Sequence, residues 1–329
     1  MKSIRKLTHA VAVLAALSFA TAGCSKDKKE DKASGDKAEA ARSSSGSKSG
    51  FAIMPKDSNA VGGINVAKIV SSNLWKQYGT MAQIRFANEL QKFKNNCNMD
   101  PFTAIESVIV AANAEENKPV IVVKGLSRSD AIPCAKKMAE AENKQLTITE
   151  EGKITKAVDA TDTAMHIGWL DDKTMVVVGE GKDKAAVETV LAGQSGLDQN
   201  AEMMDLLGNV DTGSAVWGVG RNTTGNQAGP ISGKALYSSV SLDGGLKIDA
   251  GIRQGSADEA KATAEKMSQY TAFFAGSPME KFAKKAQFKT NNQDVIFQLS
   301  LSDAEVTELI GLIMTNPDII KMAQRFGGM

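Results

Sequence analysis

The order of apolar and polar residues predicts alternating strands, hairpins and helices over residues 51–329. Apolar residues within 71–93 recur at three- and four-residue spacing, which is typical of an amphipathic helix. Shorter apolar stretches separated by polar turns predict hairpins. The elements expected up to residue 207 are strands at 59–66, 105–112, 119–124, 147–149, 153–158, 165–170 and 174–179, and helices at 71–93, from a Ser127 or Ser129 cap to about 142, at 184–191 and at 201–207.

The second part of the chain repeats much of this order. Residues 108–131 match residues 240–260 in the order of their elements, and 171–191 match 291–310. These matches predict a duplicated hairpin–helix–strand unit; chance resemblance between amphipathic segments is the alternative, because few residues are identical. The expected elements are strands at 214–219, 236–242, 246–253, 288–290 and 295–301, and helices at 256–274, with a Ser256/Glu259 capping box, at 302–314 and at 318–326.

The strand patterns predict how the sheet is covered. Apolar and polar residues alternate over 246–253, which is typical of an antiparallel sheet with one face in water. Residues 120–123 and 175–178 are apolar throughout, so we expect central strands covered on both faces. We predict an α+β fold made of two related units of mostly antiparallel sheet, with helices packed on one face. The units are residues 51–200 and 201–329, packed together.

Residues 1–23 have the features of a signal peptide. Three basic residues precede an apolar run at 10–20, and Thr21-Ala22-Gly23 leads to Cys24. The run is too short to be a permanent membrane span. The cleavage point resembles the lipobox of bacterial lipoproteins, with Thr21 where leucine is commoner. The resemblance implies cleavage before Cys24 and lipidation of that residue; an ordinary signal peptide with an incidental cysteine is the alternative.

Residues 24–50 are predicted to be a lipidated cysteine and a disordered tether, because 25–50 contain no large apolar side chain. Lipidation implies a protein of the bacterial cell envelope, anchored in a membrane through its N-terminus. The expected place is the outer membrane, facing the periplasm or the surface. The chain, with its signal peptide, tether and internal repeat, resembles uncharacterised envelope lipoproteins with duplicated α+β domains. This resemblance does not imply an active site.

Cysteine and histidine usage excludes several kinds of chemistry. Cys97 and Cys134 remain once Cys24 carries lipid, and we expect them to form a disulfide outside the cytoplasm. Two separate buried thiols are the alternative. His166 is the single imidazole of the mature chain and lies in an alternating strand, where a packed, structural role is expected. We therefore predict no metal, no cofactor and no Ser-His-Asp triad.

The charge balance argues against nucleic acid as a partner, because phosphate binding needs a basic domain and the 39 Lys and Arg are balanced by 38 Asp and Glu. The polar stretch 221–233 is a candidate binding loop, with a mere connector as the alternative. Its candidate residues are Arg221, Asn222, Thr223 and Thr224. Acidic pairs fall in predicted turns, where carboxylates are usually solvated; they are Glu115/Glu116, Glu150/Glu151 and Asp171/Asp172.

These features predict a non-enzymatic, lipid-anchored envelope lipoprotein that binds an envelope protein or serves as a structural element. A carrier of a lipid or other apolar ligand, held in a cavity between sheet and helices, is the alternative. Hydrolysis by carboxylates or serine is a third class. A closed apolar cavity of roughly several hundred Å³ would favour the carrier, whereas a polar cleft with converging carboxylates would favour an enzyme.

Overall fold

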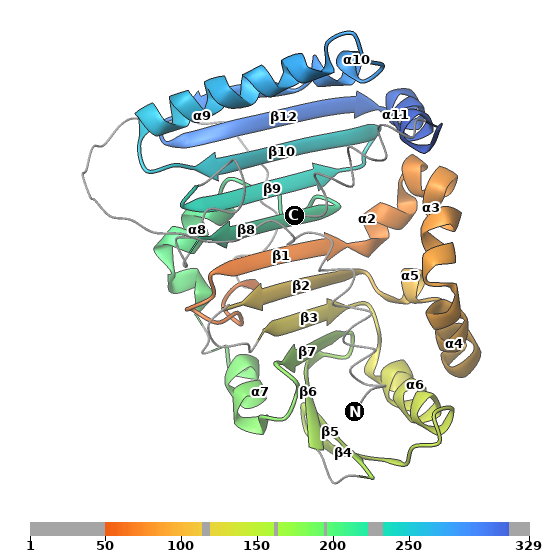
Figure 1. Ribbon diagram of the computed structural model, residues 1–329. Helices are drawn as coiled ribbons and strands as arrows, with labels where there is room; N and C mark the ends of the chain where they lie inside the picture. Colours follow the sequence, from red (N-terminus) through yellow and green to blue (C-terminus); the bar gives the residue numbers. More distant parts are fainter. Residues whose placement is uncertain (1–49, 114–118, 161–163, 194–195, 223–232, 316–329) are drawn as a thin grey trace.

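One sheet of 12 strands runs through the molecule (Figure 1). The computed structural model describes residues 50–113, 119–160, 164–193, 196–222 and 233–315. The strand order is β11-β12-β10-β9-β8-β1-β2-β3-β7-β6-β5-β4, and neighbouring strands pair antiparallel. The α+β class and the antiparallel pairing predicted from the sequence are confirmed.

The first half of the molecule contains strands β1 to β7, and the second half contains β8 to β12. The strands of the first half are β1 Ala60–Asn65, β2 Ser107–Ala112, β3 Val120–Lys124, β4 Leu146–Glu151, β5 Ile154–Asp159, β6 Ala164–Asp171 and β7 Thr174–Val178. The helices that go with them are α2 Val66–Ser71, α3 Asn73–Arg85, α4 Ala87–Cys97, α5 Pro101–Ala104, α6 Arg128–Glu140, α7 Lys184–Leu191, η2 Leu197–Gln199 and α8 Ala201–Leu207. The second half consists of β8 Val216–Arg221, β9 Ala235–Ser241, β10 Gly245–Arg253, α9 Ala257–Tyr270, η3 Thr271–Phe274, α10 Glu280–Ala283, β11 Gln287–Asn291, β12 Asp294–Ser302 and α11 Asp303–Thr315.

Both halves have the same strand order when it is counted outward from the β1–β8 pair. On one side β1 is followed by β2, β3, β7 and β6, and on the other β8 is followed by β9, β10, β12 and β11. Helix α6 follows β3 in the chain as α9 follows β10. This order is the one that the duplicated unit predicts, and it joins both halves into a single sheet.

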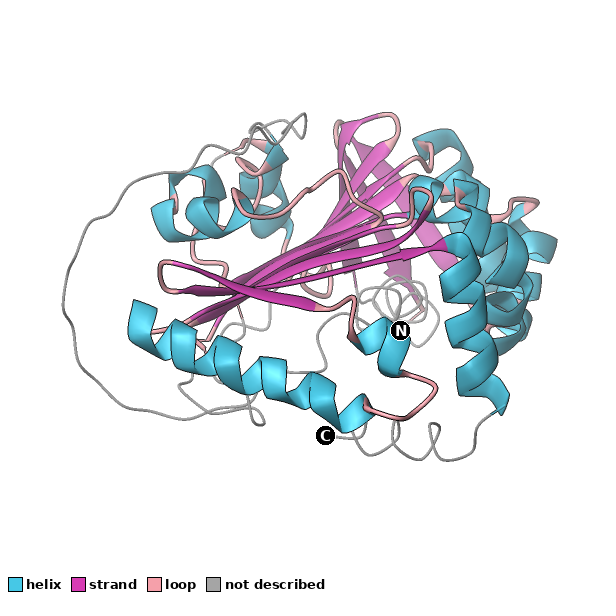
Figure 2. Ribbon diagram, turned by 90° about the horizontal axis from the view of Figure 1, so that it is seen from above, coloured by secondary structure: helices cyan, strands magenta, loops and turns pink. Residues whose placement is uncertain are grey.

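Helices cover both faces of the sheet in the first half. Alternate residues of β3 belong to different apolar clusters: Val120 packs in the cluster that includes α7 and α8, and Ile121 in the cluster beside α6. The view from above shows helices on both sides of the strands (Figure 2). The predicted placement of helices on one face is therefore wrong here, because the connection after β7, which includes Gly181 at φ 74°, leads the chain to the opposite face.

One face of β10 and β12 is mainly polar, as the alternating pattern of β10 predicts. On β8 and β9 the same face is instead buried, because Trp217 and Tyr237 pack in the cluster that includes α8, while Leu236 on the other face is exposed. Helices α9, α10 and α11 pack on the face that carries Leu246, Ile252 and Val295. On the opposite face Asp294 accepts hydrogen bonds from the Tyr237 hydroxyl at 3.0 Å and from Arg253 Nε at 2.9 Å. The hydrogen bonds to Asp294 raise the pKa of Arg253 above its usual range. This ion pair is a buried polar centre at the edge of the apolar cluster that includes α8.

The helix predicted over 71–93 is divided into α3 and α4, and a short helix that was not predicted, α2, precedes it. Ser72 is extended, with φ −67° and ψ 152°, and its side chain accepts a hydrogen bond from Trp75 N, so it ends α2 and caps α3. Phe86, with φ −115°, separates α3 from α4. A serine side chain that accepts a hydrogen bond from a backbone N–H favours the start of a new helix, which explains why α2 ends and α3 begins at Ser72. The helix expected at 318–326 lies outside the described residues.

The described helices are all too short or too polar to cross a bilayer. Several predicted boundaries are confirmed: α7 and α8 have the expected limits, and Ser127 and Ser256 are the N-caps of α6 and α9. Glu259 bonds to Gly255 N at 2.9 Å and accepts nothing from Ser256 N, so the capping box is displaced by one residue.

Candidate functional site

An apolar pocket of about 90 Å³ lies between α6 and the outer strands of the first half. Strands β4, β5, β6 and β7 form one wall, and α6 with the end of α4 forms the other. Most of the side chains that line the pocket are aromatic, aliphatic or sulfur-containing. Among them are Phe93, Ala135, Met138, Ile148, Ala157 and Trp169. The pocket thus draws on residues that are far apart in the sequence.

Few polar groups reach this pocket. Among the described residues that line it, Lys144 and Asp159 carry charge, and both lie near the start of β4. Lys144 Nζ is 2.6 Å from a Glu142 carboxylate oxygen. Thr155 Oγ1 accepts a hydrogen bond from Trp169 Nε1 at 3.0 Å. With these groups partnered inside the protein, the pocket has the chemistry to hold an uncharged apolar group.

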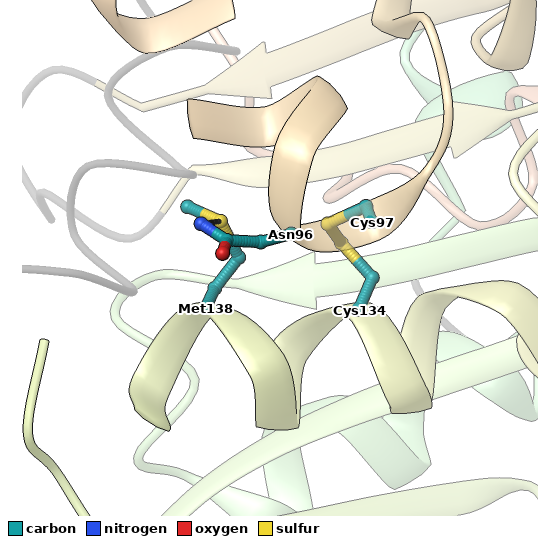
Figure 3. Close-up of a disulfide and its surroundings, with 4 residues drawn as sticks. All are labelled: Asn96, Cys97, Cys134 and Met138. Atoms are coloured by element: carbon teal, nitrogen blue, oxygen red, sulfur yellow. Dashed lines mark hydrogen bonds between the residues drawn. A yellow bond between two sulfur atoms is a disulfide. The ribbon is translucent and has the colours of Figure 1, made fainter. Parts of the chain in front are cut away.

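The Cys97–Cys134 disulfide joins the two helices of the pocket wall (Figure 3). The Cα atoms are 4.6 Å apart, which agrees with the bridge predicted from the sequence. Cys134 itself lines the pocket and is 4% exposed, while Cys97 is half-buried at the end of α4. Beside it, Asn96 Nδ2 donates a weak hydrogen bond to Met138 Sδ at 3.5 Å.

The first turn of α6 is held to the sheet by separate contacts. Arg128 Nη1 donates to Gly152 O at 2.8 Å, and Nη2 lies 2.8 Å from a Glu150 carboxylate oxygen. The guanidinium carbon is also 5.9 Å from the centre of the Trp169 ring. The backbone N–H of Arg128 donates to Asp172 O at 2.7 Å. These contacts fix this end of the helix above the β4–β5 and β6–β7 turns.

The remaining predicted site residues lie elsewhere. Cys24, Thr223 and Thr224 are outside the described residues. Arg221, at the end of β8, forms an ion pair of 2.6 Å with Glu202 of α8, and Asn222 N donates to Lys234 O at 2.8 Å. The described ends of the candidate loop therefore make contacts within the fold, and its binding role stays a prediction.

His166 lies on the face of β6 opposite the pocket and is 7% exposed. Its Nδ1 is 3.2 Å from Gly181 O, and its backbone N–H donates to the same oxygen. The imidazole thus contacts a backbone oxygen, which fits the structural role expected of it. Within the described residues no group of three or more Cys, His, Asp or Glu could hold a metal ion.

The described acidic pairs are paired with cations or with backbone. A hydrogen bond from Lys184 lowers the pKa of Glu151 and raises that of Lys184. The backbone N–H of Lys173 lowers the pKa of Asp171, and Thr174 adds a second hydrogen bond. Glu150 and Glu151 end strand β4 rather than forming the turn itself, and Glu115 and Glu116 lie outside the described residues.

The carrier alternative called for a cavity between sheet and helices, but sequence reasoning did not place it beneath α6 or identify its lining residues. Met165, Ile167 and Trp169 alternate along β6 and signal one buried face, but α6 and β4 lie next to them only after folding. A helix whose cysteine is bridged to a neighbouring helix was the available signal. It indicates that α6 has a fixed neighbour but does not indicate a space beneath it.

Comparison with known proteins identifies no family. No family model and no curated protein matches the chain. Among solved structures, crystal forms I and III of a protein called TP0453 are similar, with TM-scores of 0.45 and 0.46 and sequence identities of 10% and 12%. The matches cover 79% of this chain and 95% and 96% of those chains. We draw no functional conclusion from a likeness of this degree.

Proposed function

We propose that the protein is a lipid-anchored, non-enzymatic protein of the bacterial cell envelope that binds an apolar group in the pocket beneath α6. The observation that carries the proposal is the pocket, whose lining is mainly apolar and whose Thr155 and Lys144 have partners within the protein. Catalysis normally needs a positioned acid, base or nucleophile. The groups around this pocket offer contact surface instead.

The envelope location is supported by two observations. Residues 1–24 have the sequence of a lipoprotein signal, and Cys97 and Cys134 are bridged. Disulfides persist mainly in oxidising compartments outside the cytoplasm. Both features suit a body held at a membrane by acyl chains on Cys24, with residues 25–50 as the spacer.

The volume of the pocket bears on the choice between a binding protein and a lipid carrier. A cavity of about 90 Å³ is smaller than an engineered cavity of roughly 150 Å³ that binds one benzene molecule. A whole lipid needs several times this space, whereas a short alkyl end or one apolar side chain of a partner fits. Binding of a single apolar group is therefore the favoured function, and carriage of a complete lipid is the second candidate.

Membrane anchoring is tested with Cys24→Ala. The variant should leave the membrane fraction or accumulate as unprocessed precursor, because multiple acyl chains are what make anchoring stable. Ser25→Ala, which retains the cysteine, is the matched control and should fractionate like the parent. If Cys24→Ala behaves like the control, the anchor is elsewhere.

Pocket binding is tested with straight-chain alcohols of increasing length. We would use the mature chain from residue 24 with Cys24→Ala, so that no acyl chain competes. Each CH₂ placed in the pocket should tighten binding about fourfold, up to a cut-off near roughly four carbons set by the volume. Ala135→Leu fills the pocket and should weaken butanol binding at least tenfold. The control Ala262→Leu, at an exposed position of α9, should change nothing.

A photo-crosslinking residue distinguishes the two sources of the apolar group. Gln145 is exposed and lines the pocket rim, so p-benzoylphenylalanine there samples the occupant in living cells. An adduct that migrates as a larger protein identifies a partner side chain, and a lipid mass on the peptide identifies an alkyl chain. The same residue at Ala262 controls for unspecific capture. Equal labelling at both positions would contradict occupancy of the pocket.

A further inference from the structure

The two ends of α6 are held in different ways. The first turn is tied to the sheet by Arg128, which contacts the β4–β5 turn and the Trp169 ring. Beyond Pro133 the described contacts of the helix with neighbouring elements are the disulfide at Cys134, the weak hydrogen bond from Asn96 to Met138, and the packing of the buried Cys134 and Ala139. The second part of the helix, Cys134–Glu140, is therefore joined to α4 by one covalent bond and is otherwise held by apolar packing (Figure 3).

Pro133 lies between these two parts. Proline lacks a backbone N–H and its ring interferes with the preceding turn, so the helix is weakest at this point. Ala131 and Ile132 line the pocket before the proline, but most of the α6 residues that close it follow the proline; these are Cys134, Ala135, Met138 and Ala139. A displacement of this second part would widen the pocket while Arg128 keeps the first turn in place.

We propose that the Cys97–Cys134 disulfide sets the size of the apolar group that the pocket accepts. With the bond intact the pocket takes a short group, and after reduction by a dithiol the second part of α6 moves outward and a longer alkyl chain enters. This inference rests on the proposed binding function and adds its regulation.

The reduction is a two-electron exchange with the dithiol. A thiolate of the reductant attacks Sγ of Cys97, the more exposed of the two cysteines, and the Sγ–Sγ bond breaks. Cys134 leaves as a thiolate and takes up a proton. The second thiol of the reductant then attacks the mixed disulfide, which releases Cys97 as a thiol and leaves the reductant as a cyclic disulfide. Exchange with a disulfide oxidant, which is itself reduced to the dithiol, restores the bond and the small pocket.

The chain length at which alcohol binding stops improving measures the pocket directly. With the mature Cys24→Ala chain in its oxidised form, affinity should rise to about four carbons and then level off. After dithiothreitol treatment the rise should continue to octanol, which should bind at least tenfold more tightly than to the oxidised form. Far-UV circular dichroism verifies that the reduced protein is folded.

A variant without the bond provides the second arm. Cys97→Ser with Cys134→Ser should show the long cut-off without reductant, and dithiothreitol should not change it. If the double variant does not fold, the comparison of the oxidised and reduced parent protein tests the inference by itself. If the chain-length cut-off is the same before and after reduction, or if all alcohol binding is lost on reduction, the inference about the disulfide is wrong, while the proposed binding function stands. Failure of every alcohol to bind in either state would overturn the proposed function as well.

Discussion

The two halves of the sheet share one strand order but bury their strands differently. In the first half β7 is buried along its whole length, between α7 on one face and the cluster beside α6 on the other. In the second half the equivalent strand β12 is covered by α9 and α11 on one face, while its other face carries polar residues. The helix that follows each strand makes the difference, since α7 and α11 lie on opposite faces.

The connection decides which face the helix covers. Five residues, including glycines with φ of 55° and 74°, separate β7 from α7, whereas α11 starts directly after β12. Residues at matching positions of β7 and β12 differ in burial. Val178 is 7% exposed, whereas its counterpart Gln298 is half-buried and hydrogen-bonded to Asp249 at 2.8 Å. A repeated strand order therefore does not fix burial; the length and conformation of the connection do.

The largest expected effect is the loss of the disulfide, which only the first half contains. Removing a bridge that closes a loop of 37 residues should lower the free energy of unfolding by about 4 kcal/mol in the chain-entropy model. In Cys97→Ser with Cys134→Ser, hydrogen exchange should quicken in β4, β5 and β6 and stay unchanged in β10 and β12. Equal acceleration in both halves would show that they unfold as one unit.

Exchanging the matched residues tests the difference in burial itself. Val178→Gln places an amide in an apolar face and should lower the free energy of unfolding by about 3 kcal/mol, from lost packing and an unsatisfied polar group. The reverse change, Gln298→Val, should cost no more than about 1 kcal/mol, the net value of its hydrogen bonds. Similar costs measured by urea unfolding would refute the contrast.

The polar face of β10 and β12 has its own stabilising centre. Asp294→Asn removes the charge beside Arg253 while Asp205 still pairs with the guanidinium, so we expect a loss of about 2 kcal/mol in unfolding free energy. Tyr237→Phe removes one hydrogen bond to the same carboxylate and should cost about 1 kcal/mol. If the asparagine variant is no less stable than the phenylalanine variant, the charge contributes nothing there.

The smallest effect concerns the start of α11. Hydrogen bonds from Lys285, first, and then from Ser302 lower the pKa of Glu305 to about 2 from its usual 4.5. Because the folded pKa is the lower one, its contribution is full above pH 4.5 and is lost as pH falls from 4.5 towards 2. A titration of the carboxyl carbon by NMR should give the depressed pKa, and Lys285→Gln should raise it. An unshifted value in the parent would contradict the ion pair.

Local features of the fold could be predicted from the sequence, and long-range ones could not. The limits of α7 and α8 and the caps Ser127 and Ser256 depend on neighbouring residues, so the pattern indicates them. The break at Phe86 was missed because the apolar spacing continues across it, and the short helix α2, which ends before Ser72, was not predicted. In both cases backbone conformation at one residue decides the result.

The candidate site depended on tertiary packing even more. The bridge between Cys97 and Cys134 followed from counting cysteines, but the pocket beside it needs α6, α4 and four strands in place. The face covered by α7 was likewise hidden, because nothing in its amphipathic pattern says on which side of the sheet it packs. A sequence pattern indicates that a residue is buried, but only the folded structure shows which residues it packs against.

The β1–β8 pair gives the molecule the plan of two subunits joined in one chain. The equivalent strands β1 and β8 pair antiparallel there. Gly63 lies across from Trp217, and only glycine fits at this position, because a Cβ would come within 2.5 Å of the indole nitrogen. Antiparallel pairing of like strands about a two-fold axis is how identical protomers associate edge to edge. A chain cleaved between α8 and β8 should accordingly yield two fragments that reassociate in solution, each supplying the strand that completes the other.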